Sequence, residues 1–590
     1  MHRIISLILL LGAGLIWGDI ESEGLYDNQE EITVQPEIEI ALLELEESPV
    51  AINFEDMQRL LIIPGITSID IAKLQKIVNG RQISGRAELI KRGMSEPVMQ
   101  LIDPYITYSK PPEHKFRLAA VTSGTDSSIT SSSLRSRLQW GDLEMGFLLK
   151  RDGAEAANHV FYPFYFRYDC YPWQLTVGQY ALRWGQGLLH APAFRMGFGK
   201  TAGGILHNSG ELVRPYTSSY ANKYASGAAV RLSQGAFEGT FFFSEAELAV
   251  NYADSMQIGS FSDGSDAEEF YAVETCYGGA ITGKWEKLRW GLLAEKLRFS
   301  ADFANGMGWQ ELENYSSCLE YRMNDLLLNG ELARAGEKWG GIFVMSIGSR
   351  KFRQYLLFRS YQADFPDIHG NPPARKSHFG GEDGIYYGIN LKPAENWQVN
   401  MYADLYYFPS ARYLIDLPSG GAEQMVSVKY GKSDNYLEVY GRYKNAEQYA
   451  AIADSGKVID VENGQYQITL SQKVEQIILR NRFAWRWEAA SEAGKYQRGF
   501  VFYQQAGRQI GKCRIWVRLT AFRGELPLYL YENNLRYSSK QVCLTGDGYR
   551  VSLLLNHSWL QYKFEFKYYY ERNDDGAEQG FFAGISINKK

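Results

Sequence analysis

The feature that most constrains the fold is a period-two alternation of apolar and polar side chains over most of the chain. In residues 397–408, "WQVNMYADLYYF", apolar and polar positions exchange at nearly every step. The same pattern recurs at 436–443, 466–471, 514–519 and 562–568. Successive side chains of a β-strand point to opposite faces, so these segments predict strands with one apolar and one polar face. In the first segment, the side chains predicted to face lipid are Trp397, Val399, Met401 and Leu405.

Strands of about 9–11 residues with this pattern, separated by turns and edged with aromatic residues, are typical of outer-membrane β-barrels. About two dozen segments fit, and an even number is expected. The alternative is a soluble β-sandwich array, solenoid or propeller, but repeated inward charges are costly in a dry core. We therefore predict a mainly β fold. It consists of a large antiparallel transmembrane β-barrel at 116–590, in contact with outer-membrane lipid, preceded by a small N-terminal all-α domain.

The first 52 residues predict an export signal and a tether. Residues 1–18 have a basic start, an apolar run and small residues, as a signal peptide does; a retained anchor helix is the alternative. Residues 19–52 contain eleven acidic side chains and no Lys or Arg. Like charges extend a chain, so we predict an acidic flexible linker. An alternative is that it mimics nucleic acid and covers a basic surface nearby.

Residues 53–110 change to helical periodicity. Asn53 is a candidate N-cap for a first helix that ends at Pro64-Gly65, and a second helix follows and ends near residues 79–80. A weaker copy comes next, with a helix at 87–90, the hairpin "KRGMSE" and a helix at 98–102. The sequence therefore predicts two helical pairs, each joined by a hairpin.

This tandem resembles the helix-hairpin-helix domain of competence-type DNA receptors and DNA repair proteins. The matching residues are Ile63-Pro64-Gly65-Ile66, Ala72, "ISGRAEL" (83–89) and "LIDPYI" (101–106). In that family, hairpin backbone N–H groups at a helix N-terminus hold a phosphate without reading bases. The second glycine of the usual hairpin is replaced here by Thr67. Without DNA binding, the same module is a contact or spacing element.

The resemblance implies a set of DNA-contacting residues. Backbone phosphate contacts are expected at the first hairpin, at Gly65, Ile66 and Thr67, and at Gly93 in the second copy. Phosphate-neutralising side chains are expected at Lys73, Lys76, Lys91 and Arg92. The net charge of −6 excludes a molecule that is basic as a whole, so any DNA binding must be local.

Enzyme and metal chemistry are not indicated. The five cysteines are scattered without a CxxC pair, so we predict no metal site. Gly199-Lys200-Thr201 suggests a phosphate loop, but Phe194 stands where that loop needs a glycine. His159, His190 and His207 do not form a triad spacing with a serine and an acid. We predict no enzyme and no cofactor, and we expect the glycines of 178–204 to fold a loop against the barrel wall or into the lumen.

The order of elements also resembles a largely uncharacterised group of exported proteins of Gram-negative bacteria. These proteins join a helix-hairpin-helix segment to a long barrel-like region. The shared residues are Gly185-Gln186-Gly187-Leu188, Gly199-Lys200 and Arg214-Pro215-Tyr216. The expected function is an outer-membrane barrel whose periplasmic helical domain binds DNA non-specifically, in DNA uptake. The alternative is a structural or transport barrel whose helical domain docks a periplasmic protein.

Overall fold

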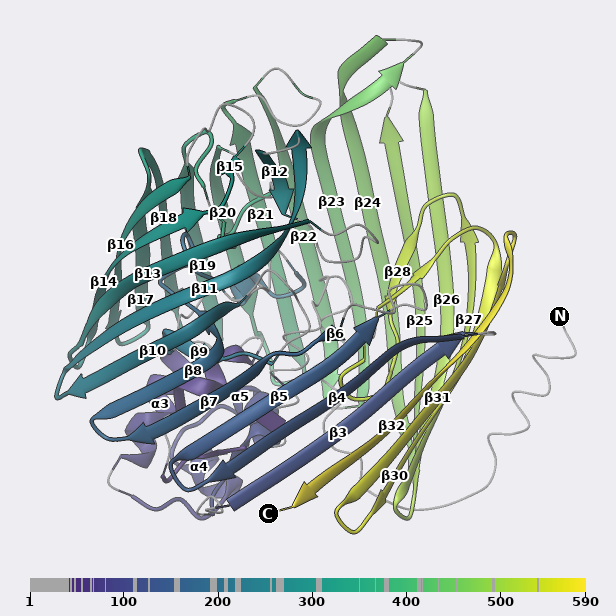
Figure 1. The fold of residues 1–590 in the computed structure, drawn as a ribbon. Coiled ribbons are helices and arrows are strands. Elements are labelled where there is room, and N and C mark those ends of the chain that lie inside the picture. Colours follow the sequence, from purple (N-terminus) through teal and green to yellow (C-terminus); the bar gives the residue numbers. More distant parts are fainter. Residues whose placement is uncertain are drawn as a thin grey trace, which may run out of the picture.

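The computed structural model describes most of the barrel and of the region that precedes it (Figure 1). The described residues are 42, 45, 46, 49–54, 57–63, 66, 68–79, 81–109, 114–125, 128–152, 160–191, 199–205, 211–217, 224–254, 257–261, 270–303, 310–349, 351–366, 368–375, 381–410, 415, 418–432, 434–452, 455–490, 494–538 and 541–589. The predicted signal peptide lies outside them.

A helical region precedes the barrel. Its helices are η2 (Met57–Ile62), α3 (Ser68–Val78), α4 (Arg86–Lys91), α5 (Glu96–Ile102) and η3 (Asp103–Tyr105). A short parallel pairing of β1 (Val50–Ala51) with β2 (Ile106–Thr107) joins the two ends of the region. Buried apolar side chains from all these elements form one cluster, so the region has a core of its own. Within the described residues, no helix combines the length and apolar character needed to cross a membrane.

The boundary predicted between linker and helices is wrong. Leu42, Leu45 and Val50 were placed in a flexible linker, yet they are at most 2% exposed and pack into the cluster of the helical region. The acidic composition concealed these apolar side chains. Asn53 is not the predicted N-cap either. Its side-chain amide donates to the carbonyls of Ile83 and Tyr108 and accepts the Ile83 N–H, each at 2.9 Å, so it ties distant parts of the region together.

The second helical pair follows the prediction closely. The α4 helix ends at Lys91, and two residues later Gly93 has a φ of 102°, a conformation that suits glycine after a helix end. The Gly93 N–H donates to Ile90 O, and the Met94 N–H donates to Leu89 O, each at 2.9 Å. The Ser95 hydroxyl then accepts the Val98 N–H at 3.2 Å and caps α5. The segment "KRGMSE" is therefore a helix stop followed directly by a helix start.

The rest of the chain forms one large antiparallel sheet. Of the 28 strands in this sheet, four are short accessory strands, β6, β9, β12 and β15, which leaves 24 in the barrel wall. The wall strands are β3 (His114–Thr125), β4 (Ser128–Trp140), β5 (Leu143–Asp152), β7 (Phe164–Cys170), β8 (Trp173–Leu182), β10 (Ala225–Gln234), β11 (Phe237–Asp254), β13 (Phe270–Lys284), β14 (Leu288–Phe299), β16 (Glu311–Met323), β17 (Leu326–Ala335), β18 (Lys338–Gly348), β19 (Phe352–Tyr361), β20 (Glu382–Leu391), β21 (Trp397–Phe408), β22 (Ser419–Lys432), β23 (Asn435–Ile452), β24 (Ser455–Val474), β25 (Ile477–Ala490), β26 (Lys495–Ile510), β27 (Cys513–Gly524), β30 (Gly548–Trp559), β31 (Tyr562–Asn573) and β32 (Gly576–Lys589). The accessory strands are β6 (Val160–Phe161), β9 (Val213–Pro215), β12 (Gln257–Phe261) and β15 (Asp302–Phe303).

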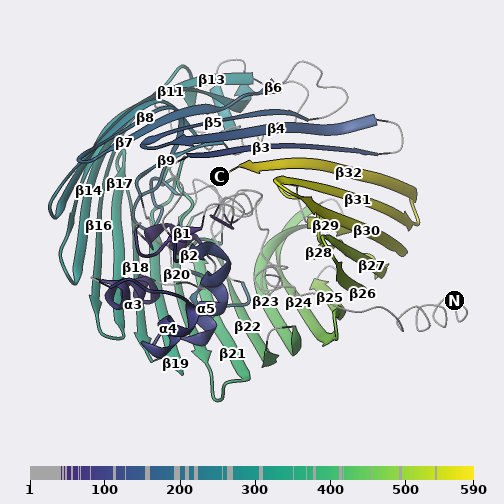
Figure 2. The ribbon, with the colours of Figure 1, turned by 90° about the horizontal axis from the view of Figure 1, so that it is seen from below.

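Pairing of the first and last wall strands closes the barrel. The register of β3 with β32 runs from Phe116 with Lys589 to Thr125 with Gly580. Figure 2 shows the resulting ring, with β3 and β32 adjacent. Closure leaves no free strand edge in the wall. The predicted barrel of about two dozen strands is confirmed.

The two faces of the wall differ in the way that the alternation predicted. On β21, Trp397 and Leu405 are 41% and 55% exposed and point outward, whereas Asn400 and Asp404 are buried on the inner face. Outward apolar side chains continue across the neighbouring strands in one paired row, which contains Val428, Val439, Ile468, Phe483 and Phe502. The outer face is therefore built for lipid, and the inner face is polar.

The two ends of the barrel differ in the lengths of their connections. At one end the turns are short, such as residues 141–142, 235–236 and 475–476. The helical region, the start of β3 and the end of β32 lie at this end (Figure 1). The other end carries the long connections 183–224, 362–381 and 525–547. Outer-membrane barrels have short periplasmic turns and longer extracellular loops. The helical region is at the end that has the short turns.

Candidate functional site in the barrel lumen

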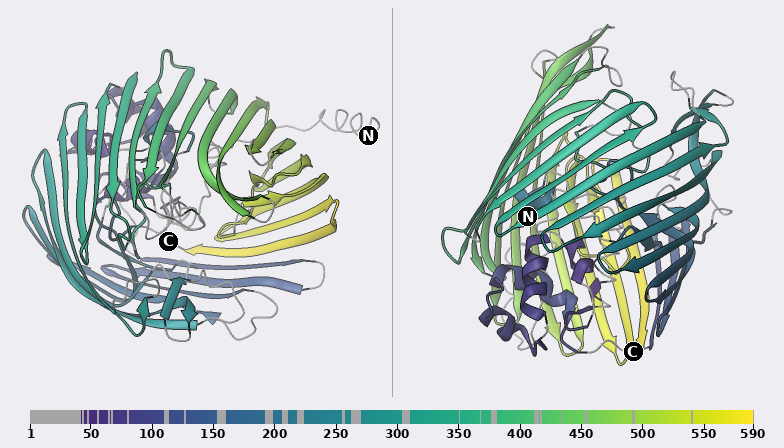
Figure 3. Two further views of the ribbon diagram at one scale, coloured as in Figure 1. Left: turned by 90° about the horizontal axis from the view of Figure 1, so that it is seen from above. Right: turned by 90° about the vertical axis from the view of Figure 1, so that its left-hand side faces the viewer.

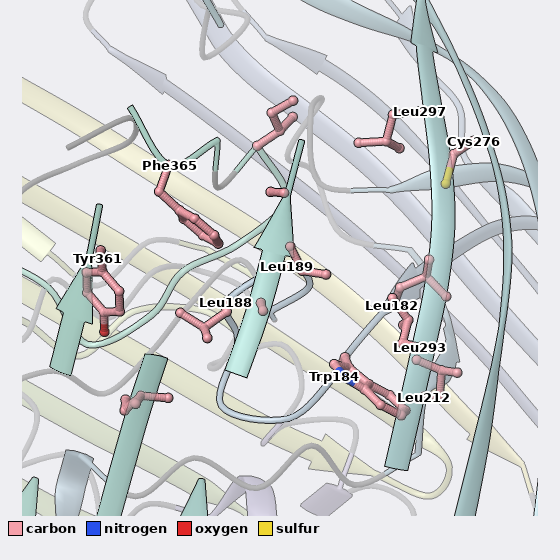
Figure 4. Close-up of a cluster of buried hydrophobic side chains, with 14 of the residues drawn as sticks. Leu182, Trp184, Leu188, Leu189, Leu212, Cys276, Leu293, Leu297, Tyr361 and Phe365 are labelled. Carbon is pink, nitrogen blue, oxygen red and sulfur yellow. The ribbon is translucent and has the colours of Figure 1, made fainter. Parts of the chain in front are cut away.

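The three long connections turn back into the barrel. We call residues 183–224, 362–381 and 525–547 the first, second and third luminal segments. The described parts of the first segment lie inside the ring of strands when the barrel is viewed from above (Figure 3). The first and second segments contribute Trp184, Leu188 and Phe365 to a buried cluster with inward side chains of the wall (Figure 4). The sequence allowed the glycines of 178–204 to fold a loop against the wall or into the lumen. The described residues of this loop, 183–191 and 199–204, lie in the lumen.

Glu331 of β17 holds the first luminal segment. Its carboxylate accepts the backbone N–H groups of Gln186 and Leu188, the latter at 3.2 Å, and the Ser316 hydroxyl at 2.9 Å. Gly185 has φ +50°, and a Cβ there would lie 2.5 Å from the Glu331 carboxyl carbon. Glycine is therefore required at position 185 both for the backbone conformation and for the close approach of the carboxylate.

Two histidines join the first and second segments to the wall. His190 pairs with Glu295 of β14, and His369 pairs with Glu274 of β13 at 2.8 Å. The two imidazole rings stack with centroids 5.7 Å apart, and the Ala191 N–H donates to His369 O at 3.0 Å. Among the described residues no group of three or more His, Cys, Asp or Glu is arranged to hold a metal. The four side chains act as a clamp on the two segments.

A second charged cluster anchors the second luminal segment. Arg359 is fully buried and donates to Glu382 at 2.6 Å and to Asp404 at 2.7 Å. Arg375, on the segment itself, donates to the same Asp404 at 2.6 Å and lies 3.0 Å from Glu423. Buried ion pairs compensate their desolvation only when they are well paired. Removing one member of this cluster therefore leaves the others buried without full compensation.

Lys200 anchors a later part of the first segment. It is 1% exposed, and its ammonium lies 3.1 Å from Gln467 Oε1 and 3.4 Å from Glu438 Oε2. The neighbouring helix η4 (Ala202–Ile205) accepts the Tyr386 hydroxyl at Ala202 O, at 2.8 Å. In this structure, Lys200 is a wall anchor. Its burial agrees with rejecting a phosphate loop from the sequence.

The third luminal segment covers the opposite part of the wall. It contains a hairpin of β28 (Leu528–Tyr531) and β29 (Gln541–Leu544). Between them, Glu532 is 3% exposed and lies 2.7 Å from Lys567 and 3.2 Å from Arg550. Leu535 is fully buried against Trp516 and Leu554 of the wall. Apolar and charged contacts together hold this segment inside the barrel.

The predicted DNA-contacting residues lie on the helical region, outside this site. Gly65 and Thr67 are not among the described residues. Ile66 is buried, and its N–H donates to Ile63 O at 3.1 Å, so that amide already has an acceptor within the hairpin. The Gly93 N–H is likewise used in the helix stop described above. These two amides are not available to a phosphate in this conformation.

The predicted basic side chains differ from one another. Lys73 and Lys76 are exposed one turn apart on α3, and Lys91 is exposed at the end of α4. Arg92 instead lies 2.7 Å from Glu88, four residues earlier. The Glu88 carboxylate also accepts the Ser84 backbone N–H at 3.0 Å, and the two contacts lower its pKa to about 2. Arg92 therefore has an acidic partner within its own helix.

Sequence reasoning missed the anchoring residues of the lumen. Glu331, Asp404 and Glu274 are buried at inward positions of wall strands, where strand alternation is compatible with polar residues but assigns none of them a role. Their partners lie far away in the sequence; for example, Lys200 and Gln467 are 267 residues apart. The one available signal was the run of glycines at 185 and 187 beside a long connection.

Comparisons with known proteins add little. No family model matches the chain, and no curated protein matches it. Among solved structures, the FrpB iron transporter of Neisseria meningitidis is 9% identical, with a TM-score of 0.41 and coverage of 81% of each chain. The siderophore receptor PirA of Acinetobacter baumannii is 8% identical, with a TM-score of 0.42 and coverage of 82% of each chain. FpvA of P. aeruginosa is 10% identical, with a TM-score of 0.40 over 82% of this chain and 72% of its own. At this level, the resemblance has no bearing on ligand or mechanism.

Proposed function

We propose that the protein is a gated transport barrel of the outer membrane, closed at rest by its own luminal segments. The observation that carries the proposal is the way in which these segments are held. Arg375 and Lys200 are on the segments, and their carboxylate partners, Asp404 and Glu438, are on the wall. Charged contacts inside a wall that already closes by backbone pairing are not needed for the barrel itself.

Charged anchors of this kind are suited to reversible release. When a luminal segment moves, each charged side chain of an anchoring ion pair can exchange its partner for water or for a charged solute. The apolar contacts of Trp184, Leu188 and Phe365 then set how much of the segment leaves the wall. The proposed cycle has a closed state, as described, and an open state in which the first and second segments are detached from their anchoring wall strands, which lie between β13 and β24.

Planar-bilayer recording tests this function. The Arg375→Ala variant removes a luminal anchor and leaves the wall strands unchanged, so we expect larger or longer openings than in the unaltered protein. Arg334→Ala is the matched control, because Arg334 is on the outer face of β17, where its guanidinium donates to the backbone carbonyl of Gly336 at 2.8 Å. Equal conductance of all three proteins would contradict the proposal.

A second candidate function is non-specific DNA binding by the helical region, proposed as a periplasmic step of DNA uptake. It is favoured by the exposed pair Lys73 and Lys76 together with Lys91. Phosphate binding by lysines weakens steeply with salt. We therefore expect the full chain in detergent to bind duplex DNA of any sequence at low salt, and we expect Lys73→Ala with Lys76→Ala to weaken it.

The control for this test is Lys432→Ala, which removes an exposed lysine near a short turn at the same end of the barrel. Loss of DNA binding in the control to the same extent would assign the effect to general charge. Absence of salt-dependent binding in the unaltered protein would favour the alternative, in which the helical region docks a periplasmic protein partner.

A further inference from the structure

A cavity of about 720 Å³ lies in the barrel at the end of the short turns. It is bounded by β3, β4, β31 and β32 on the wall side, and by Thr217 and Arg536 of the first and third luminal segments. It is separate from the contacts that anchor the first and second luminal segments between β13 and β24. None of the described residues that line it is acidic. Six of them are basic: Arg117, Arg135, Arg137, Arg536, Lys563 and Lys589.

The pairing register places three of the arginines on one face of the wall. Arg117 of β3 is directly opposite Arg137 of β4, so both point to the same face, and Arg135 is two residues further along. Like charges opposite each other on a sheet are unfavourable, and this arrangement is therefore a cost to folding. Tyr537 of the third segment lies under the Arg135 guanidinium, 4.7 Å from ring centroid to Cζ, and fixes its orientation.

Three carboxylates border the cavity from outside its lining. Glu144 lies 2.8 Å from Arg137, Glu565 lies 3.3 Å from Lys563, and Glu46 lies 3.6 Å from Arg536. These carboxylates offset part of the positive charge, whereas the described residues that line the cavity include six basic residues and no acidic one. Guanidinium groups present several donors in a planar fork that matches phosphate and carboxylate oxygens.

We propose that this cavity binds a small multivalent anion carrying phosphate or carboxylate groups. The inference rests on the proposed transport function in that it names the chemical class of the solute. Hydroxyl and amide groups of Tyr537, Ser586 and Asn588 lie beside the basic residues and supply neutral hydrogen bonds to the same solute. A cation or a neutral sugar finds no comparable match there.

Isothermal titration calorimetry on the full chain in detergent tests the proposal, with pyrophosphate and citrate as separate probes and glucose as the neutral control. We expect saturable binding of at least one anion, strong at about 10 mM salt and weaker at about 150 mM, where the Debye length falls from about 30 Å to about 8 Å. Pyrophosphate alone would identify a phosphate site, and citrate alone a carboxylate site.

Variants locate the binding. Arg135→Gln and Lys563→Gln should each weaken it roughly tenfold, because each removes one charge-assisted contact. Arg298→Gln is the matched control, since Arg298 is exposed at the opposite end of the barrel. Arg135→Lys keeps the charge and should lose less affinity than Arg135→Gln. Heat-modifiability on gels verifies that each variant is folded.

Absence of binding of either anion at low salt would overturn the inference, as would equal losses in Arg135→Gln and Arg298→Gln. These results are independent of the conductance test above. Anion binding with no change of conductance in Arg375→Ala would leave the cavity assigned and reject the gating. Altered conductance without anion binding would reject only the cavity's ligand.

Discussion

At the residue scale, a few positions combine a backbone requirement with a close contact. Gly185 is the clearest, because a left-handed conformation and the Glu331 carboxylate both exclude a side chain there. The sequence predicted that the glycines of 178–204 let a loop fold against the wall or into the lumen, and it gave Gly185 no contact of its own. The reason for the requirement is the carboxylate of Glu331, which is distant in the sequence and which no local pattern reveals.

Gly185→Ala tests that requirement. A non-glycine residue in the left-handed region costs roughly 1–2 kcal/mol, and the added methyl also displaces Glu331. We expect the first segment to dock less firmly, which would appear as more frequent channel opening in planar bilayers. Gly239→Ala is the control, because a Cβ at that wall position meets no atom within 4 Å. Similar opening of both variants would contradict the assignment.

A second residue-scale prediction concerns Glu88. Its pKa is lowered mainly by the Ser84 backbone N–H, and then by Arg92. A lowered pKa means that the contacts stabilise the helical region above the usual Glu pKa, and that this stabilisation is lost as pH falls through about 2. Glu88→Gln should remove this acid dependence and release Arg92. Circular dichroism against pH, with Glu96→Gln as a comparison, measures the difference.

At the element scale, whole connections are held by clusters of charges on facing strands. Arg359, Arg375 and Asp404 come from β19, the second luminal segment and β21. Strand alternation predicts that Asp404 faces inward, but the identity of its partners depends on how the long connection folds. Connection folding is specified by contacts distant in the sequence, and this is why the sequence predicted the wall better than its contents.

Asp404→Asn tests the cluster. It leaves two buried guanidinium groups without their shared carboxylate, and breaking a buried pair costs about 3–5 kcal/mol. We expect a lower unfolding temperature than that of Asp383→Asn, a carboxylate on the outer side of the adjacent strand whose Oδ1 accepts the Ser360 hydroxyl at 2.6 Å. Equal melting of the two variants would show that the cluster adds no stability.

At the scale of the whole molecule, the alternation of side chains determined most of the architecture. It predicted the barrel, the approximate strand number and the lipid-facing side chains Trp397 and Leu405. It did not predict the exact count of wall strands, because accessory strands such as β12 and β15 have the same local character. The helices of the preceding region were also expected, whereas the packing of Leu42 and Leu45 was concealed by their acidic neighbours.

Val399→Arg and Gln398→Arg test the orientation of the wall in a single strand. Val399 points outward and is paired with Val428, and Gln398 points inward and is paired with Lys429. Arginine on the lipid face near the bilayer midplane costs roughly 2–4 kcal/mol, and an inward position tolerates it better. We expect less folded protein in the membrane for Val399→Arg, measured by heat-modifiability. Equal yields would contradict the assigned faces.

The first luminal segment is continuous with β8 and β10 at its two ends, so the stopper is covalently part of the tube. It cannot be lost, exchanged or titrated away by another molecule. In the proposed gating cycle, reclosure is therefore a unimolecular event, and its rate does not depend on how many copies of the protein the cell makes. Attachment at both ends also limits how far the first luminal segment can move. The length of the segment therefore sets the largest opening through which a solute could pass.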